Sequence, residues 1–244
     1  MNKIALPALL CVLTLSACSD PEAERARQEL AAAAESARKQ QEAAVIAGNF
    51  DQAVAAGDWD KARLLGVSLL DQYPDTAAAT AVAAQMDDVR GKAEAARELR
   101  RLRALWHYNQ VAAGSGLQQS AAIYAKTPLD VDGSGAKAVQ LVFRDHPQWK
   151  QHAYLVLQAG DFRCAGGCQV KVRIDDGPER AMAAWRPDTD EAIAMFITDH
   201  KRLWKNAAQA GQLSIEFPVR AGGTRTAVFE TKGVDVSRLP ARWQ

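Results

Sequence analysis

The sequence predicts an α+β protein: an N-terminal helical stalk and hairpin, followed by an antiparallel β-sandwich-like domain with one crossing helix. From residue 21 to about residue 103 the chain is rich in Ala, Glu, Gln, Arg and Leu, which are all good helix formers. Beyond Tyr108, apolar residues alternate with polar ones in short runs, which is the pattern of half-buried strands. Residues 199–210 alone return to helical spacing, with Gly211 as a stop signal.

Residues 1–17 have the layout of a secretory signal peptide. Lys3 precedes an apolar stretch that runs from Ile4 to Leu15 and is broken only by Pro7 and Thr14. A membrane-spanning helix needs ~20 apolar residues, so this stretch is too short to span and instead matches a signal-peptide core. No later apolar run is long enough to cross a bilayer.

The segment Leu15–Cys18, with the sequence LSAC, resembles the bacterial lipobox. The resemblance implies that Cys18 receives a diacylglycerol and becomes the N-terminus of a bacterial envelope lipoprotein, which two or more acyl chains would hold firmly on the membrane. The alternative is an ordinary secreted protein with a chance cysteine at this place. By resemblance to the sorting rule of enteric bacteria, Asp directly after the Cys favours the inner membrane. Ser19 stands there and Asp20 follows, so we expect the outer membrane, on the side that faces the periplasm.

The charge balance argues against nucleic acid as a partner. The chain has 30 basic and 29 acidic residues, and removal of residues 1–17 takes away Lys3 alone. Nucleic-acid binding needs a clustered basic surface, which a neutral chain of this kind does not indicate.

The four cysteines divide by position. Cys11 leaves with the signal peptide and Cys18 takes lipid, which leaves Cys164 and Cys168 in the sequence CAGGC. The envelope is an oxidising compartment, and the two intervening glycines permit a tight turn, so a structural disulfide is expected. A zinc site with His146 and His152 upstream is the alternative, although no second close cysteine pair is present. A redox-active dithiol is disfavoured because three residues, and not two, separate the cysteines.

The helical half divides into a lipidated N-terminus and polar, Ala-rich stalk (18–47) and a helical hairpin (48–103). The segment Gly57–Ala62, GDWDKA, followed by Pro74, resembles the second helix of a tetratricopeptide repeat. Ile46 and Phe50 stand where that family prefers Trp and Gly. Only one copy is visible, and a repeat array needs about three. The resemblance therefore implies one hairpin of this style, extended by a single helix from about Asp75 to Arg103.

The β-rich segment spans residues 104–235 and a C-terminal tail covers 236–244. Four runs place alternate residues on one face: Val139, Leu141 and Phe143; Val170, Val172 and Ile174; Ile193, Met195 and Ile197; Leu213, Ile215, Phe217 and Val219. The stretch from about Ala125 to Lys137 lacks this alternation and contains Pro and two glycines, so we expect a protease-sensitive linker. The alternative is a surface loop inside the β domain, if residues 118–124 form the strand that pairs with 139–143.

The β-rich segment also resembles a group of uncharacterised, secreted or lipidated proteins of Gram-negative bacteria. The resemblance covers residues 104–235 and rests on shared motifs along the chain: Trp106-x-Tyr108, Gly160-Asp161-Phe162-x-Cys164, Cys168, Val170 to Gly177 (VKVRIDDG), Met195-Phe196-Ile197, Leu213-x-Ile215 and Phe229. The chain departs from the group at Ile174, where Phe is usual, and at Asp161, where Gln is common. The resemblance supports the domain boundaries and the disulfide and implies no reaction.

Asp130, Asp132 and Ser134 match the opening of a calcium loop, because alternate oxygen side chains can face one ion and glycines permit the turn. The residue twelve positions in, which should be acidic, is Leu141. A plain Asp/Gly/Ser connection explains the same residues and is favoured.

Signatures of catalysis are weak. Ser115 and Ser134 lie between glycines but lack the strand–turn–helix context of a nucleophile elbow, and the four histidines have no metal-ligand spacing. Asp175 and Asp176 precede Gly177-Pro178, which is turn chemistry. We therefore expect no enzyme, no cofactor and no resident metal.

Two Trp/Arg pairs are candidates for a ligand surface: Trp185 with Arg186, and Trp243 with Arg242. Exposed Trp and Arg together are typical of binding hot spots, although ordinary amphipathic packing explains them too. The expected function is that of a non-enzymatic, membrane-anchored lipoprotein whose β domain binds a protein or a cell-wall component. The alternatives are an immunity or inhibitor lipoprotein that neutralises a periplasm-targeted toxin or hydrolase, and, from another class, an envelope hydrolase.

Overall fold

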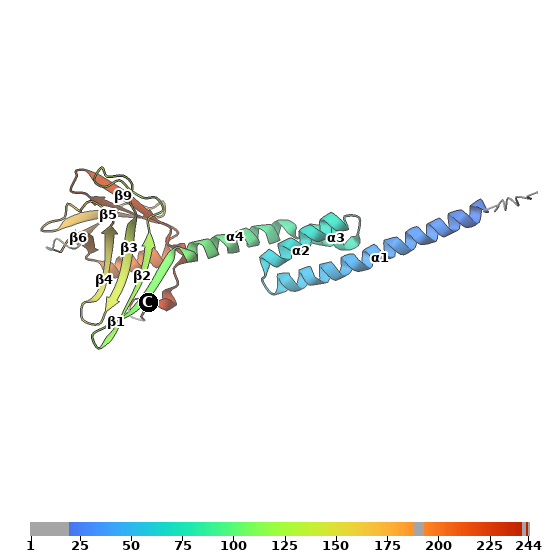
Figure 1. The fold of residues 1–244 in the computed structure, drawn as a ribbon, viewed down its shortest axis with the longest axis horizontal. Helices are drawn as coiled ribbons and strands as arrows, with labels where there is room; N and C mark the ends of the chain where they lie inside the picture. Colours follow the sequence, from blue (N-terminus) through green and yellow to red (C-terminus); the bar gives the residue numbers. More distant parts are fainter. Residues whose placement is uncertain (1–19, 188–192, 241–242, 244) are drawn as a thin grey trace, which may run out of the picture. The chain divides into compact units, whose positions relative to one another are not determined.

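The computed structural model describes residues 20–187, 193–240 and 243. Within these residues four helices precede nine strands, and a fifth helix lies between the seventh and eighth strands, so the α+β class is confirmed (Figure 1). The helices are α1 (Pro21–Ala55), α2 (Trp59–Gln72), α3 (Ala77–Ala83), α4 (Met86–Ala104) and α5 (His200–Gln209). Contacts divide the chain into two compact units, a helical unit that ends at Ala93 and a β unit that begins at Glu94. The division therefore falls inside α4, before the boundary expected at residue 103.

Side-chain caps explain where the helices of the helical unit begin. The carboxylate of Asp20 accepts from the backbone of Glu22, and Pro21 occupies the first turn of α1. Asp58 caps α2 and Thr76 caps α3 in the same way, each through its side-chain oxygen. The capped start of α2 fits the Gly-Asp-Trp motif, because Gly57 (φ +70°) takes the left-handed conformation that ends α1.

The core of the helical unit begins well inside α1. Residues 21–41 are exposed throughout, and the first buried side chain is that of Ala43. Farther on, Phe50 of α1 and Met86 of α4 pack against Gly66 of α2, where the missing side chain makes room for them. The single helix expected from Asp75 to Arg103 is wrong, since a turn separates α3 from α4.

The β unit is one continuous antiparallel sheet with the order β1-β2-β3-β4-β7-β6-β5-β8-β9. The strands are β1 (Trp106–Ala113), β2 (Gly116–Tyr124), β3 (Val139–His146), β4 (Lys150–Leu157), β5 (Cys168–Ile174), β6 (Arg180–Trp185), β7 (Ala194–Ile197), β8 (Leu213–Pro218) and β9 (Thr224–Phe229). All nine strands contribute buried side chains to one apolar cluster. The amide of Lys126, just after β2, donates to the carbonyl of Val228 in β9 at 2.7 Å, so the sheet curls round that cluster. The sandwich-like arrangement thus takes the form of a single curled sheet.

The predicted crossing helix is α5, which closes the core. Leu203, Trp204 and Ala207 are buried in the cluster, and the Trp204 ring meets Phe143 of β3 edge-on with centroids 4.9 Å apart. Trp243 packs against both rings. Residues 236–240 are not a free tail, because Val236–Arg238 form a 3-10 turn and Leu239 is buried.

The stretch Ala125–Lys137 is not a linker between the halves. β2 pairs with β3 from Gln119–Asp145 to Tyr124–Gln140, so the stretch connects two strands of one sheet. Leu129 and Lys137 form a bridge across it, and Val131 is buried. The loop alternative is confirmed and the linker interpretation was wrong.

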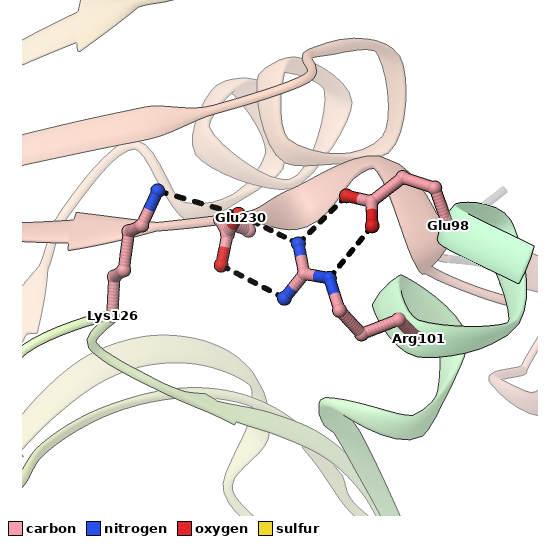
Figure 2. Close-up of polar contacts among 4 residues, drawn as sticks. All are labelled: Glu98, Arg101, Lys126 and Glu230. Carbon is pink, nitrogen blue, oxygen red and sulfur yellow. Dashed lines mark hydrogen bonds and ion pairs between the residues drawn. The ribbon is translucent and has the colours of Figure 1, made fainter. Parts of the chain in front are cut away.

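The last turns of α4 belong to the β unit. Leu102 is buried, and Figure 2 shows Arg101 between Glu98 and Glu230, with Lys126 beside Glu230. The guanidinium donates to both carboxylates, at 2.7 and 2.8 Å to Glu98 and at 2.8 and 3.3 Å to Glu230. These hydrogen bonds lower the pKa of the Glu230 carboxyl, although its partial burial opposes the shift. All three guanidinium nitrogens of Arg101 donate to these two carboxylates. We therefore assign the cluster to holding the end of α4 on the β unit and not to binding a ligand.

Candidate functional site: an aromatic row on the outer face of the sheet

The solvent-facing side of the curled sheet carries a row of π-systems. The row consists of Trp185 (β6), Phe196 (β7), Tyr154 (β4), Arg144 (β3) and Trp149 in the β3–β4 turn, and we call it the aromatic row. The strand register creates it, because Trp185 lies directly opposite Phe196 and Phe196 directly opposite Tyr154. All of these strand positions alternate with buried residues of the core, so their side chains point outward.

The members of the aromatic row contact each other in sequence. The Trp185 and Phe196 rings are stacked, with centroids 4.6 Å apart and an interplanar angle of 16°. The Phe196 and Tyr154 centroids are 4.9 Å apart. The Arg144 guanidinium lies 5.2 Å from the Tyr154 ring and 5.3 Å from the Trp149 ring. Stacked and cation–π contacts of this kind fix the side chains in one arrangement before any partner arrives.

Both ends of the aromatic row are open to solvent. Trp149 is 59% exposed and Trp185 is 41% exposed. Trp149 nevertheless has a defined orientation, because it stacks on His146 with centroids 4.0 Å apart. His146 is fixed in turn, since its Nδ1 accepts from the backbone amides of Gln148 and Trp149.

Arg144 is a cation without an acidic partner among the described residues. It makes no salt bridge there, and its Nε is buried without a hydrogen-bond acceptor. A buried donor without an acceptor costs free energy.

His152 lies on the same face of β4 as Tyr154 and directly opposite Arg144 of β3. Its ring meets Phe196 edge-on with centroids 5.4 Å apart, and its Nδ1 is buried without a partner. Burial lowers the pKa of His152, and the charges of Arg144 and His200 lower it further.

The rest of the outer face has a different character. On β5, β8 and the turn before β6, the outward side chains form ion pairs instead, Lys171 with Glu216 at 2.9 Å and Arg173 with Glu179 at 2.6 Å. This charged patch shows what an ordinary solvated face of this sheet looks like. The two exposed tryptophans of the aromatic row distinguish the other half of the sheet from such a face.

The sequence found only part of this site. Trp185 lies in the aromatic row as expected of a ligand surface, but Arg186 is held by Asp161 at 2.8 Å and by the carbonyl of Pro187. The expectation of an exposed Trp243 was wrong, because its ring is 4% exposed and completes the core. Arg242 lies outside the described residues, as does Cys18.

Phe196, Tyr154, Arg144 and Trp149 were missed by the sequence reasoning. The available signal was the outward half of each alternating strand, whose aromatic character is unusual for solvent-facing positions. The pairing order β4-β7-β6, which places these residues side by side, could not be read from the sequence.

The Cys164–Cys168 pair is bonded in the structure, with the turn between them carrying Gly166 and Gly167 at positive φ. The calcium alternative has no support: the Asp130 and Asp132 carboxylates accept from the backbone amides of Gly133 and Ser134. Across the described residues, no group of three or more His, Cys, Asp or Glu side chains is arranged to hold a metal ion.

In the part of the chain that the structure describes, no helix is both long enough and apolar enough to cross a membrane. No family model, curated protein or solved structure matches the chain.

Proposed function

We propose that this protein is a non-enzymatic lipoprotein of the bacterial envelope that binds a protein partner through the aromatic row. The observation that carries the proposal is a pre-ordered strip of Trp, Phe, Tyr and Arg on a solvent-facing sheet. Aromatic residues and Arg are enriched at protein interfaces and dominate their hot spots.

The packing of the rings favours a protein over a cell-wall glycan. Sugars stack on the open, flat face of an aromatic ring. Trp185 and Phe196 use ring faces on each other, and Trp149 uses one on His146. In each of the two exposed tryptophans, one ring face is already stacked on a neighbour, and the Arg144 guanidinium lies over the Trp149 ring. A guanidinium among aromatic rings suits a carboxylate and the side chains of a protein partner.

The anchor is part of the same proposal. A lipid on Cys18 would hold the chain to the membrane, and residues 21–41 of α1 make no buried contact. A helix of this length reaches about 30 Å at 1.5 Å per residue, enough to serve as a spacer behind the lipid.

The partner is tested with matched surface variants of the full chain in detergent. The row variant is Trp149→Ser/Trp185→Thr, and the control is Lys171→Gln/Glu216→Gln, which removes the two charges of one ion pair from the charged patch. Immobilised wild type and control should retain the same protein from an envelope extract of the source bacterium, and the row variant should lose it. With the partner purified, the row variant should bind about 100-fold more weakly, as expected for two hot-spot side chains.

Retention of the same protein by all three forms, or by none, contradicts the proposal. Sedimentation with purified peptidoglycan supplies the rival outcome. Pelleting of wild type and control, but not of the row variant, would replace the protein partner with a glycan.

The anchor is tested separately. Cys18→Ser should move the protein from the membrane fraction to the soluble fraction or block its processing, because two acyl chains are needed for firm binding. Unchanged partitioning into detergent would refute lipidation at this position and leave the binding proposal standing.

A further inference from the structure

A second surface, which shares no residue with the aromatic row, has the features of a small-molecule site. A groove of about 520 Å³ runs between α5 and the C-terminal segment. Its lining consists of Lys201, Trp204, Lys205, Ala208, Gln209, Val236 and Trp243. The volume lies within the range of sites for small ligands.

The groove has an apolar floor and a cationic rim. Trp204 and Trp243 are 3% and 4% exposed, and their rings meet edge-on with centroids 5.6 Å apart. Lys201 and Lys205 are four residues apart on α5, so their ammonium groups project from the same side of the helix. Like charges at this spacing repel and weaken a helix, which makes the pair a cost to the free protein.

The described residues that line the groove carry no negative charge, and neither lysine forms a salt bridge there. The indole Nε1 of Trp243 is also buried without a hydrogen-bond acceptor. A ligand that brought an anion to the rim would remove the repulsion between the lysines.

We propose that this groove binds a small amphiphilic anion, an acyl chain or aromatic body that carries a carboxylate or phosphate. The apolar body would lie against Val236, which is 39% exposed, and the small exposed parts of Trp204 and Trp243, and the anion would lie between Lys201 and Lys205. A cation is excluded by the rim, and a neutral polar molecule gains little from the floor. The proposal does not depend on the partner of the aromatic row.

The test uses the full-length protein and four ligands. Decanoate and decyl phosphate carry the anion, and decanol and decyltrimethylammonium have the same chain without it. Binding is followed by tryptophan fluorescence, since two tryptophans form the floor, and by displacement of anilinonaphthalene sulfonate. Lys201→Gln/Lys205→Gln removes the rim, and Lys137→Gln/Lys171→Gln removes two lysines of the β unit that do not line the groove.

Decanoate or decyl phosphate should saturate the wild type and the control double variant alike. The ratio of the two affinities then shows whether the lysine rim prefers a carboxylate or a phosphate. Affinity should fall about tenfold in Lys201→Gln/Lys205→Gln, and decanol and decyltrimethylammonium should bind no better than this variant binds the anions. Equal binding of all four ligands, equal affinity of the two double variants, or no saturable binding of either anion would overturn the proposal.

Discussion

The inward and outward side chains of β6 have different roles, the first in folding and the second in the proposed binding surface. Met182 points into the core and is 5% exposed, whereas Trp185, three residues on, stands in the aromatic row. Met182→Ala should lower the free energy of unfolding by about 2–5 kcal/mol, since it leaves a cavity. Trp185→Thr should cost only about 1 kcal/mol, the value of one aromatic pair, because its ring already meets solvent. Chemical denaturation measures both, and a larger loss for Trp185→Thr would assign that side chain to folding and not to binding.

His152 makes the stability of the β unit depend on pH. Burial, then Arg144, then His200 lower the pKa of His152 in the folded state. The unfolded chain therefore binds the proton first, so stability is complete above the ordinary histidine pKa of about 6.5 and falls as pH drops below it. His152→Gln should flatten the dependence of Tm on pH between about 5 and 7. An unchanged slope in the variant would show that another group is responsible.

At the scale of elements, the contact of α4 with the C-terminal segment explains why two units meet inside a helix. A Cβ on Gly233 would collide with the backbone of Leu102 and Arg103, which cannot move aside as a flexible side chain would. Gly233→Ala should therefore destabilise the β unit by about 1–3 kcal/mol, as overpacking does.

Gly91→Ala, within the helix α4 that Gly233 approaches, is the control. Nothing lies within 4 Å of the added methyl group, and its backbone is helical. This change should stabilise by up to about 1 kcal/mol because Ala is the better helix former. Thermal melts of both variants measure the difference, and the same sign for both would contradict the close approach at Gly233.

At the scale of the whole molecule, these contacts predict where a truncated fragment must begin if the β unit is to fold without the helical unit. A fragment that begins at Glu94 keeps buried Leu102 and the Arg101–Glu230 pair. A fragment that begins at Trp106 loses both and leaves a bare patch on the core. We expect the longer fragment to melt cooperatively and the shorter one to melt at a lower temperature or aggregate. Equal melting temperatures would return the boundary to residue 103.

Some strands could be predicted from the sequence because burial of one sheet face makes apolar residues recur at every second position. Val139, Leu141 and Phe143 alternate cleanly, and the structure buries all three. β1 escaped notice because at an edge of the sheet it buries Trp106 and leaves most later residues exposed. The exposure of Trp243 was misjudged because position near a chain end says nothing of burial once α5 offers an aromatic surface.

The central claim, that a protein covers the aromatic row, is tested most directly by site-specific photo-crosslinking in living cells of the source organism. Full-length chains carry p-benzoylphenylalanine in place of Trp185 in the aromatic row, or in place of Lys171 in the charged patch of the same outer face. Irradiation should produce one discrete, heavier adduct from position 185 and none from position 171. The account would be contradicted by no adduct at 185, or by the same adduct from both positions.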